Sequence, residues 1–208
     1  MMQLLELGGV ILWVILGFSF IIVLLILQRA LTVHRASLRG RDFLKGIFNN
    51  LQRGNLVEAA ALCEESPGPV PQMARVAILE YRQGGARLRQ VMEEVGVIEI
   101  ARLEKNLPIL LALAQMAPVL GLLGTVVGMW DMFMALHQQA PLLQSGDLGL
   151  GMSRALITTM AGLGACVVGY FGHAFIVNRI SAVVLEMEQA YTEIMQELTH
   201  LDPAPPKS

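Results

Sequence analysis

Residues 106–130 read NLPILLALAQMAPVLGLLGTVVGMW and contain no Asp, Glu, Lys or Arg. Residues 7–28 and 155–178 are equally free of charge. Each stretch is longer than the ~20 residues that a helix needs to cross the hydrocarbon core of a bilayer. We therefore predict an all-α membrane protein with three transmembrane helices, over residues 7–28, 106–130 and 154–178.

The composition supports this class and excludes others. Of the 208 residues, 54% are hydrophobic and 15% are charged, whereas soluble domains have about 25% charged residues. The net charge of −2 gives no basic excess of the kind that nucleic-acid binders carry. The two cysteines, Cys63 and Cys166, fall in different segments, so we expect neither a disulfide nor a metal site but two small buried apolar residues.

The distribution of positive charge predicts the orientation. Residues 29–105 hold 12 of the 15 Lys and Arg residues, and residues 106–153 hold none. By the positive-inside rule, residues 29–105 form a cytoplasmic segment, while residues 131–153 form the outer end of the second span and a periplasmic loop. The N-terminus is then periplasmic and residues 179–208 are cytoplasmic. No basic segment precedes the first span and no A-x-A-like site follows it, so we expect it to remain uncleaved.

The cytoplasmic segment reads as helices. Apolar residues recur on one helical face over residues 43–51, and an alanine-rich run continues to about residue 65. Residues 66–71 (SPGPVP) predict a break because proline interrupts a helix. A second helix is expected over residues 72–82, before Gly84 and Gly85.

The remaining helices are expected to be long. If the third helix continues into the second span, it covers residues 86–137 and bends at Pro108 and Pro118. Residues 138–150 are expected to form a short loop, and residues 180–198 an amphipathic helix ending in a frayed tail. Long helices with an apolar stripe need a partner to pack on, so we expect a homo-oligomer with a helical cytoplasmic rim.

The second and third spans contain many small residues at helical spacing. Lipid offers no hydrophobic drive for helix association, so close packing at small residues has to supply it. These two spans are therefore expected to pack tightly on other helices, whereas the first span looks lipid-facing. The packing residues that we predict are Gly121, Gly124, Gly128, Ala161, Ala165 and Gly169.

A few polar side chains interrupt these spans. Thr125, Thr158 and Thr159 lie inside them, and the plainest interpretation is that each hydroxyl bonds a carbonyl of its own helix. Asp131 and Arg154 bound the outer ends of the second and third spans. On antiparallel helices they reach one depth and could form an ion pair; the alternative is that each simply reaches the outer interface.

Enzymatic signatures are absent from the sequence. There is no P-loop, nucleophile elbow, H-E-x-x-H or Cys-x-x-Cys motif. The glycines of GLLGTVVG lie within an apolar span rather than after a strand, which argues against a phosphate site. We expect a protein that is not an enzyme, with no catalytic residue, no metal site and no cofactor.

Two segments carry a family resemblance. Residues 117–129 (APVLGLLGTVVGM) closely resemble the second-span signature of the ExbB/TolQ proton-channel family, which also includes the flagellar stator protein MotA. Residues 154–163 (RALITTMAGL) resemble the opening of that family's third span. The order and orientation of the spans are similar over nearly the whole chain. Three spans point to ExbB and TolQ rather than to MotA, which has four.

The resemblance implies a function and partners. It implies a pentamer in the bacterial inner membrane around the single spans of an ExbD- or TolR-like dimer, whose membrane aspartate takes part in proton transfer. A TonB- or TolA-like protein would couple the proton motive force to outer-membrane transport or envelope maintenance. Thr125 and Thr159 match the family threonines of the second and third spans and Thr158 adjoins Thr159, so these three residues are expected to line the proton path.

One position departs from the family. Relatives often carry glutamate where this chain has Arg154, and Asp131 stands where several have a neutral residue, which is consistent with a charge swap into an ion pair. A different class of function, a structural membrane scaffold whose threonines and glycines serve only packing, remains open. A small-solute transporter is disfavoured because three spans contain no inverted repeat.

Overall fold

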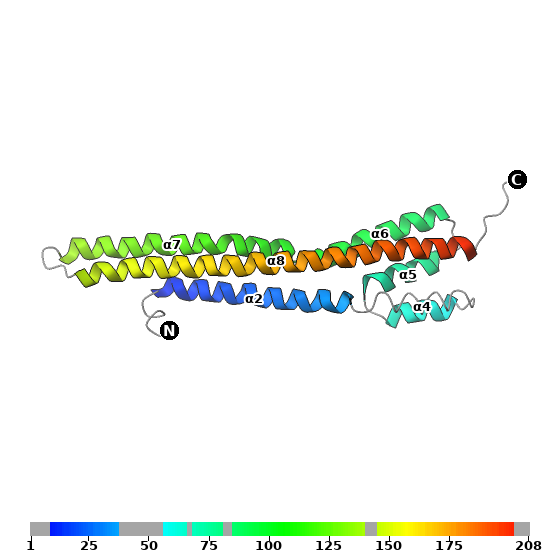
Figure 1. Ribbon diagram of the computed structural model, residues 1–208, viewed down its shortest axis with the longest axis horizontal. Coiled ribbons are helices and arrows are strands. Elements are labelled where there is room, and N and C mark those ends of the chain that lie inside the picture. The colour runs from blue at the N-terminus through cyan, green and yellow to red at the C-terminus, as the bar shows by residue number, and fades with distance from the viewer. Residues whose placement is uncertain (1–8, 38–55, 66–67, 81–84, 140–144, 202–208) are drawn as a thin grey trace. The chain divides into compact units, whose positions relative to one another are not determined.

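The structure is a computed structural model of the 208-residue chain, and it describes residues 9–37, 56–65, 68–80, 85–139 and 145–201. Within these ranges every regular element is a helix (Figure 1). The helices are α2 (Gly9–Ser37), α4 (Leu56–Glu65), α5 (Pro69–Glu80), α6 (Gly85–Glu104), α7 (Leu107–Gln139) and α8 (Ser145–Leu201).

Among the described residues, three helical stretches are long and apolar enough to cross a bilayer. They are Gly9–His34, Arg87–His137 and Gly149–Gln196. The prediction of an all-α membrane protein with three apolar helices is confirmed. Gly149–Gln196 belongs to α8, a single helix of 57 residues.

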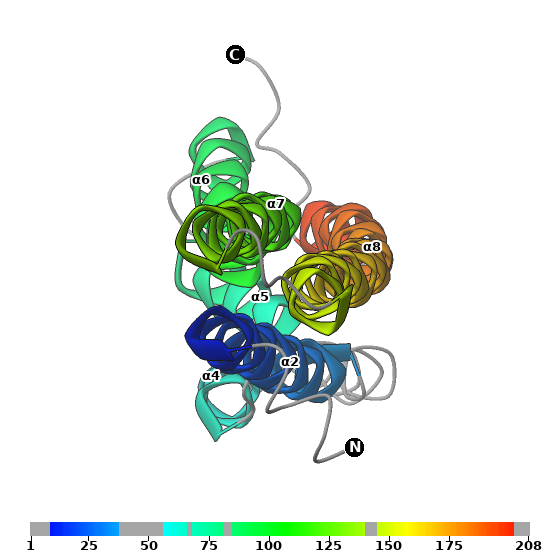
Figure 2. The ribbon, with the colours of Figure 1, turned by 90° about the vertical axis from the view of Figure 1, so that its left-hand side faces the viewer.

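The chain divides into two compact units. Unit 1 comprises Met1–Arg29 and Asn106–Phe175, and unit 2 comprises Ala30–Lys105 and Ile176–Ser208. In unit 1, α7 and α8 lie side by side (Figures 1 and 2). They are antiparallel, because Gly128 of α7 approaches Ala155 early in α8 while Ala114 approaches Gly169 further along α8.

The first helix packs on α8 and runs parallel to it. Gly9, at the start of α2, lies beside the Arg154 side chain, and Ile26 lies against Gly172. The residues of α2 that are buried recur at intervals of three, four or seven and include Leu12, Ile15 and Ile22. The opposite face of this helix is exposed, as a membrane helix at the periphery of the unit requires.

Unit 2 is built from the shorter helices and the end of α8. The buried side chains of α8 recur every three or four residues and belong to one stripe, consisting of Ile180, Val183, Met187, Ala190 and Ile194. This stripe is the expected apolar face of an amphipathic helix. An ion pair of 3.2 Å between Arg75 and Glu64 links α5 to α4.

The start of the second cytoplasmic helix differs from the expected one. α5 begins at Pro69 rather than at residue 72, and Pro69 and Pro71 both lie in its first turn. Prolines are tolerated there because the backbone N–H groups of a first helical turn have no partner within the helix. The carbonyl of Gly68 accepts the first helical hydrogen bond, from the Gln72 N–H at 3.4 Å.

The expected continuous helix over residues 86–137 is interrupted. α6 ends at Glu104, and Asn106 has a φ of 68°, in the left-handed region that asparagine tolerates better than most residues. The Asn106 carbonyl then accepts the N–H of Leu110 at 3.1 Å and begins α7. The chain therefore breaks at Asn106, whereas Pro118 lies inside α7.

The expected loop over residues 138–150 is shorter in the structure, because α7 extends to Gln139 and α8 already begins at Ser145. Of the helix expected over residues 43–65, residues 56–65 form α4, and residues 43–55 lie outside the described ranges.

Candidate functional site

The contact between α7 and α8 is a seam of small residues. Along both helices the members alternate at spacings of three and four residues, so they stay on one face. All are buried. The seam consists of Ala114, Ala117, Gly121, Gly124 and Gly128 on α7, and Gly151, Ala155, Thr158, Gly162, Ala165 and Gly169 on α8.

The glycines of the seam allow the two backbones to approach closely. A Cβ atom placed on Gly162 would lie 2.7 Å from the Ala117 carbonyl oxygen, and one on Gly128 would lie 2.9 Å from the Gly151 carbonyl oxygen. A Cβ on Gly124 would overlap the Thr158 side chain. Real Cβ atoms do not occupy such positions, so the seam requires glycine at these points.

The structure places five of the six predicted packing residues in this seam. Ala161 is instead half-buried, and its neighbour Gly162 takes the seam position. Several seam members were not among the predicted packing residues, including Ala114, Ala117, Gly151 and Ala155. Their signal was present in the sequence as one small residue at every third or fourth position.

The three threonines occupy different environments. Thr158 is fully buried in the seam, and its hydroxyl donates to the carbonyls of Arg154 and Ala155, both at 3.0 Å. The Thr159 hydroxyl donates to the Ala155 carbonyl at 3.0 Å. The Thr125 hydroxyl donates to the Leu122 carbonyl at 2.5 Å. Thr125 and Thr159 are half-buried, one residue beyond the seam on their respective helices.

Helical geometry places Thr125 and Thr159 on one side of the α7–α8 pair. Successive residues of a helix are rotated by about 100° around its axis. Because α7 and α8 are antiparallel, the residue that follows a seam residue lies on the same side of the pair in both helices. Gly124 contacts Thr158, so these two residues lie at the same depth. The next residue on each helix lies about 1.5 Å away in opposite directions, so Thr125 and Thr159 differ in depth by about 3 Å. The two hydroxyl-bearing side chains therefore form a polar patch on a surface that is otherwise apolar.

Arg154 faces away from this polar patch. It lies five positions before Thr159, and five steps of about 100° place the two side chains about 140° apart around the axis of α8. Its guanidinium lies beside the start of α2, where a Cβ on Gly9 would be 3.2 Å from its Nε atom. Gly9 has a φ of 63°, a conformation that glycine adopts without strain.

Arg154 also pairs with Asp131 of α7. Its Nη1 atom donates to the Asp131 Oδ2 atom at 2.5 Å, and about two fifths of each side chain is exposed. A single charge in hydrocarbon costs roughly 2.5–3.5 kcal/mol on insertion scales, so two opposite charges at one depth are better tolerated together than apart. The pair thus joins α7, α8 and the beginning of α2.

No group of three or more His, Cys, Asp or Glu side chains within the described ranges has an arrangement that could hold a metal ion. Cys63 on α4 is buried, and burial raises the pKa of its thiol to about 11 although the nearby Arg75 guanidinium lowers it in part. A thiol of this kind is protonated and unreactive near neutral pH.

Hydroxyl groups give the polar patch a chemistry suited to proton transfer without a permanent charge. A threonine hydroxyl both donates and accepts hydrogen bonds, so it can hold a water molecule or solvate a carboxyl group from another chain. The charge-free stretches that include Thr125 and Thr159 contain no acidic residue.

Comparison with known proteins identifies the family. The sequence profile of the MotA/TolQ/ExbB proton channel family matches residues 68–189. An ExbB homolog of Methanothermobacter thermautotrophicus is 26% identical over 182 residues, which cover 87% of this chain and 64% of that protein. The chain thus spans less than two thirds of the length of this relative.

Two further relatives are bacterial. The Tol-Pal system protein TolQ of Haemophilus influenzae is 28% identical, over 89% of this chain and 84% of that protein. An ExbB-like protein of Synechocystis is 30% identical, over 75% of each. The resemblance of residues 117–129 and 154–163 is therefore confirmed by matches over most of the chain. On this basis, the chain is a multi-pass inner-membrane protein that belongs to the MotA/TolQ/ExbB proton channel family.

Proposed function

We propose that this chain is the proton-channel subunit of an inner-membrane complex like ExbB–ExbD or TolQ–TolR. Such a complex uses the proton motive force to energise outer-membrane transport or envelope maintenance. The observation that carries the proposal is the placement of Thr125 and Thr159 on one side of the α7–α8 pair, at nearly the same depth. Two hydroxyl groups on a helix surface within the hydrocarbon region favour a polar partner on that side.

The partner is a single-span protein that carries a membrane aspartate. Its carboxyl group supplies the acidic group that the charge-free stretches of this chain lack, and the hydroxyls of Thr125 and Thr159 solvate it. Thr158 supports the path from the seam, where it fixes the position of Thr159 relative to α7. One charge that crosses 100 mV releases about 2.3 kcal/mol, which is the energy available to displace the partner.

The proposed assembly is a homo-oligomer, a pentamer, that surrounds the partner spans, and a TonB- or TolA-like protein transmits the motion. Large apolar side chains on α7 and α8 are exposed in the single chain, among them Leu122, Val126 and Leu163. They suit contacts with lipid and with neighbouring subunits. In this arrangement residues 29–105 and 179–208 are cytoplasmic, and the N-terminus is periplasmic, in keeping with the excess of Lys and Arg.

A structural scaffold is the alternative function, and one observation favours it. Each of the three threonine hydroxyls donates to a carbonyl of its own helix, the usual arrangement of threonine in an apolar helix. In a scaffold these hydroxyls serve only their own helices, and the seam glycines serve only packing.

Replacing Thr159 by Val distinguishes the two functions. Valine keeps the shape of the side chain and removes the hydroxyl, so assembly should persist in both cases. We purify the Thr159→Val variant with its partner and reconstitute it in liposomes. Under a membrane potential, its proton flux should be at least about tenfold lower than that of the wild type. Ser181→Ala is the matched control, because the Ser181 hydroxyl makes the same bond to a carbonyl four residues earlier, in unit 2. Unchanged flux in an intact Thr159→Val complex would refute the proton path.

A further inference from the structure

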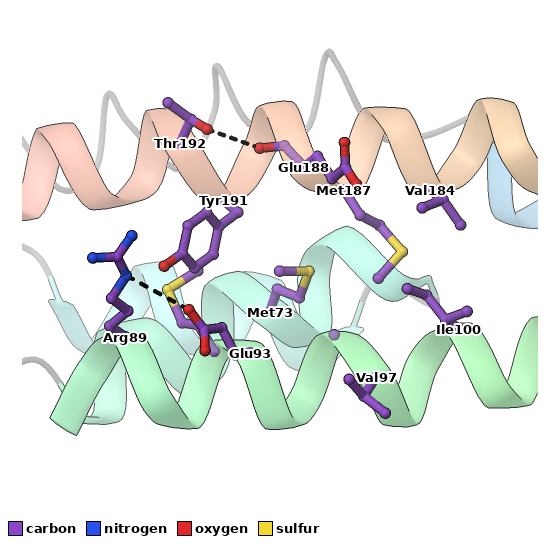
Figure 3. Close-up of a pocket in the computed structure, with 12 residues that line it drawn as sticks. Met73, Arg89, Glu93, Val97, Ile100, Val184, Met187, Glu188, Tyr191 and Thr192 are labelled. Carbon is purple, nitrogen blue, oxygen red and sulfur yellow. Dashed lines mark hydrogen bonds and ion pairs between the residues drawn. The ribbon is translucent and has the colours of Figure 1, made fainter. Parts of the chain in front are cut away.

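Unit 2 contains a cavity of about 500 Å³ between α5, α6 and the end of α8 (Figure 3). Its floor is formed by three buried methionines, Met73, Met92 and Met187, one from each helix. Cavities that bind ligands or side chains typically have volumes of about 300–1,000 Å³ and mostly apolar walls. This cavity has the size and lining of a binding site and lies outside the α7–α8 seam.

Gly96 keeps the cavity open. It lies in the middle of α6 and lines the cavity, and a Cβ atom placed on it would meet nothing closer than the Met73 Cε atom at 3.9 Å. The close approach that requires glycine at Gly162 is therefore absent here. Glycine in a helix costs about 1 kcal/mol relative to alanine, and no contact within the described ranges accounts for it at this position.

A buried hydroxyl also lacks a partner. Tyr191 projects from α8 toward α6 in Figure 3, and its hydroxyl group is buried without a hydrogen-bond partner among the described residues. An unsatisfied buried hydroxyl costs about 1–3 kcal/mol. The thioether chains on the cavity floor are flexible, so an occupant can displace them and offer Tyr191 a polar atom.

The charged residues that line the cavity have a negative balance. Arg89 and Glu93 on α6 form an ion pair of 3.5 Å, and Glu188 on α8 adds a second carboxylate. Both members of the ion pair are largely exposed, so they mark the mouth of the cavity rather than its floor. Val97, four residues after Glu93 on α6, also lines the cavity and is 68% exposed.

We propose that this cavity is a docking groove for a basic amphipathic helix of a partner protein. Methionine-lined surfaces adapt to apolar side chains of different shape, and amphipathic helices bind such grooves through residues at i, i+3, i+4 and i+7. The excess carboxylate selects a segment whose polar face carries Lys or Arg. The proposal concerns unit 2 alone and does not depend on proton conduction.

The first experiment measures binding of a defined peptide. The full-length protein is reconstituted in phosphatidylcholine nanodiscs, and the probe is a fluorescein-labelled 18-residue peptide with Leu at i, i+3, i+4 and i+7 and Lys elsewhere. We expect saturable binding beyond that of empty nanodiscs, weakened by salt. The same peptide with Glu in place of Lys should bind at least tenfold more weakly. Equal binding of the two peptides, or equal binding to empty nanodiscs, would overturn the proposal.

Variants locate the binding. Gly96→Leu fills the cavity and should weaken binding of the Lys peptide at least tenfold, while Glu188→Gln, a surface change that leaves the fold intact, should weaken it about threefold. Glu104→Gln, an exposed change on α6 away from the cavity, is the matched control and should bind like the wild type. Equal binding by Glu188→Gln and Glu104→Gln would contradict the charge argument. A photo-crosslinker at Val97 that joins only copies of this chain would show that a second copy covers the groove, and would refute the proposal.

Discussion

Gly124 of α7 and Thr158 of α8 lie so close together that neither position tolerates a larger side chain. A Cβ atom on Gly124 would lie 2.5 Å from the Thr158 Cβ atom. The side chain of Thr158 is branched and fully buried, so it has no free space into which to move. The contact therefore fixes the register of the two helices at the depth of the polar patch.

Gly124→Ala should weaken the α7–α8 pair. Overpacking of a close contact costs about 1–3 kcal/mol, so we expect a lower melting temperature in mild detergent. Gly164→Ala on α8 is the control, because a Cβ on Gly164 would meet nothing within 4 Å. It should leave the melting temperature unchanged or slightly raised. If the two variants lose the same stability, close packing at Gly124 is not the cause.

The Asp131–Arg154 pair should respond as a coupled unit. Asp131→Asn and Arg154→Gln each leave one charge at the outer end of a span, and each should reduce the yield of assembled protein in the membrane. The charge-exchanged double variant, Asp131→Arg with Arg154→Asp, should recover part of the yield. Arg89→Gln removes a pair of 3.5 Å with Glu93 in which both side chains are largely exposed, and it should have little effect on this yield. Purely additive losses in the double variant would argue against pairing.

Cys63 should react slowly with alkylating reagents. Its thiol pKa is raised by burial to about 11 from an ordinary 9.0, so near neutral pH the folded protein holds about one hundredth of the thiolate of an exposed cysteine. In a Cys166→Ser background, iodoacetamide should label the native protein at least about a hundredfold more slowly than the unfolded protein. The rate should rise about tenfold per pH unit until near pH 11.

The same shift predicts how stability depends on pH. The unfolded thiol loses its proton near pH 9 while the folded thiol keeps it, so the stabilising contribution is complete below pH 9 and is lost as pH rises toward 11. Replacing Cys63 by Ala should flatten this part of the stability profile. A labelling rate in the native protein like that of the unfolded chain would show that the thiol is accessible.

Asn106 should tolerate glycine better than alanine. Its φ of 68° lies in the left-handed region, where a Cβ atom costs roughly 1–2 kcal/mol and glycine has no penalty. We expect Asn106→Ala to lower the midpoint of unfolding in detergent by an amount equivalent to about 1 kcal/mol, and Asn106→Gly to be neutral. Asn178→Ala, an exposed change within α8, should be neutral or stabilising. An unchanged midpoint for Asn106→Ala would mean that the break lies elsewhere.

Much of the fold follows from features that sequence expresses directly. Charge-free stretches longer than a bilayer crossing predicted three apolar helices, and the spacing of Ile180, Val183 and Met187 predicted an amphipathic end to α8. Boundaries followed less well. Pro69 and Pro71 were interpreted as a break although proline is compatible with a first turn, and the interruption before α7 depends on the backbone angle of Asn106.

The candidate site was harder to predict because it depends on helical phase. Gly124, Gly128 and Ala165 were selected for their size, but Ala161 and Gly162 are equally small neighbours, and only the partner helix determines which of them faces the seam. For the same reason the sequence grouped Thr158 with Thr125 and Thr159. The contact between Gly124 and Thr158 places Thr158 in the interior of the pair and the other two on its side.

The alternating spacing of the seam also determines how α7 and α8 can move. A repeat of three and four residues has a period of 3.5, which winds two helices around each other in a left-handed supercoil. If α8 rotated about its own axis relative to α7, Leu156 or Leu163 would enter a gap that now admits only glycine, alanine or threonine. The two helices must therefore turn together as one unit. Any rotation relative to another chain has to take place where the outer surfaces of this pair contact that chain.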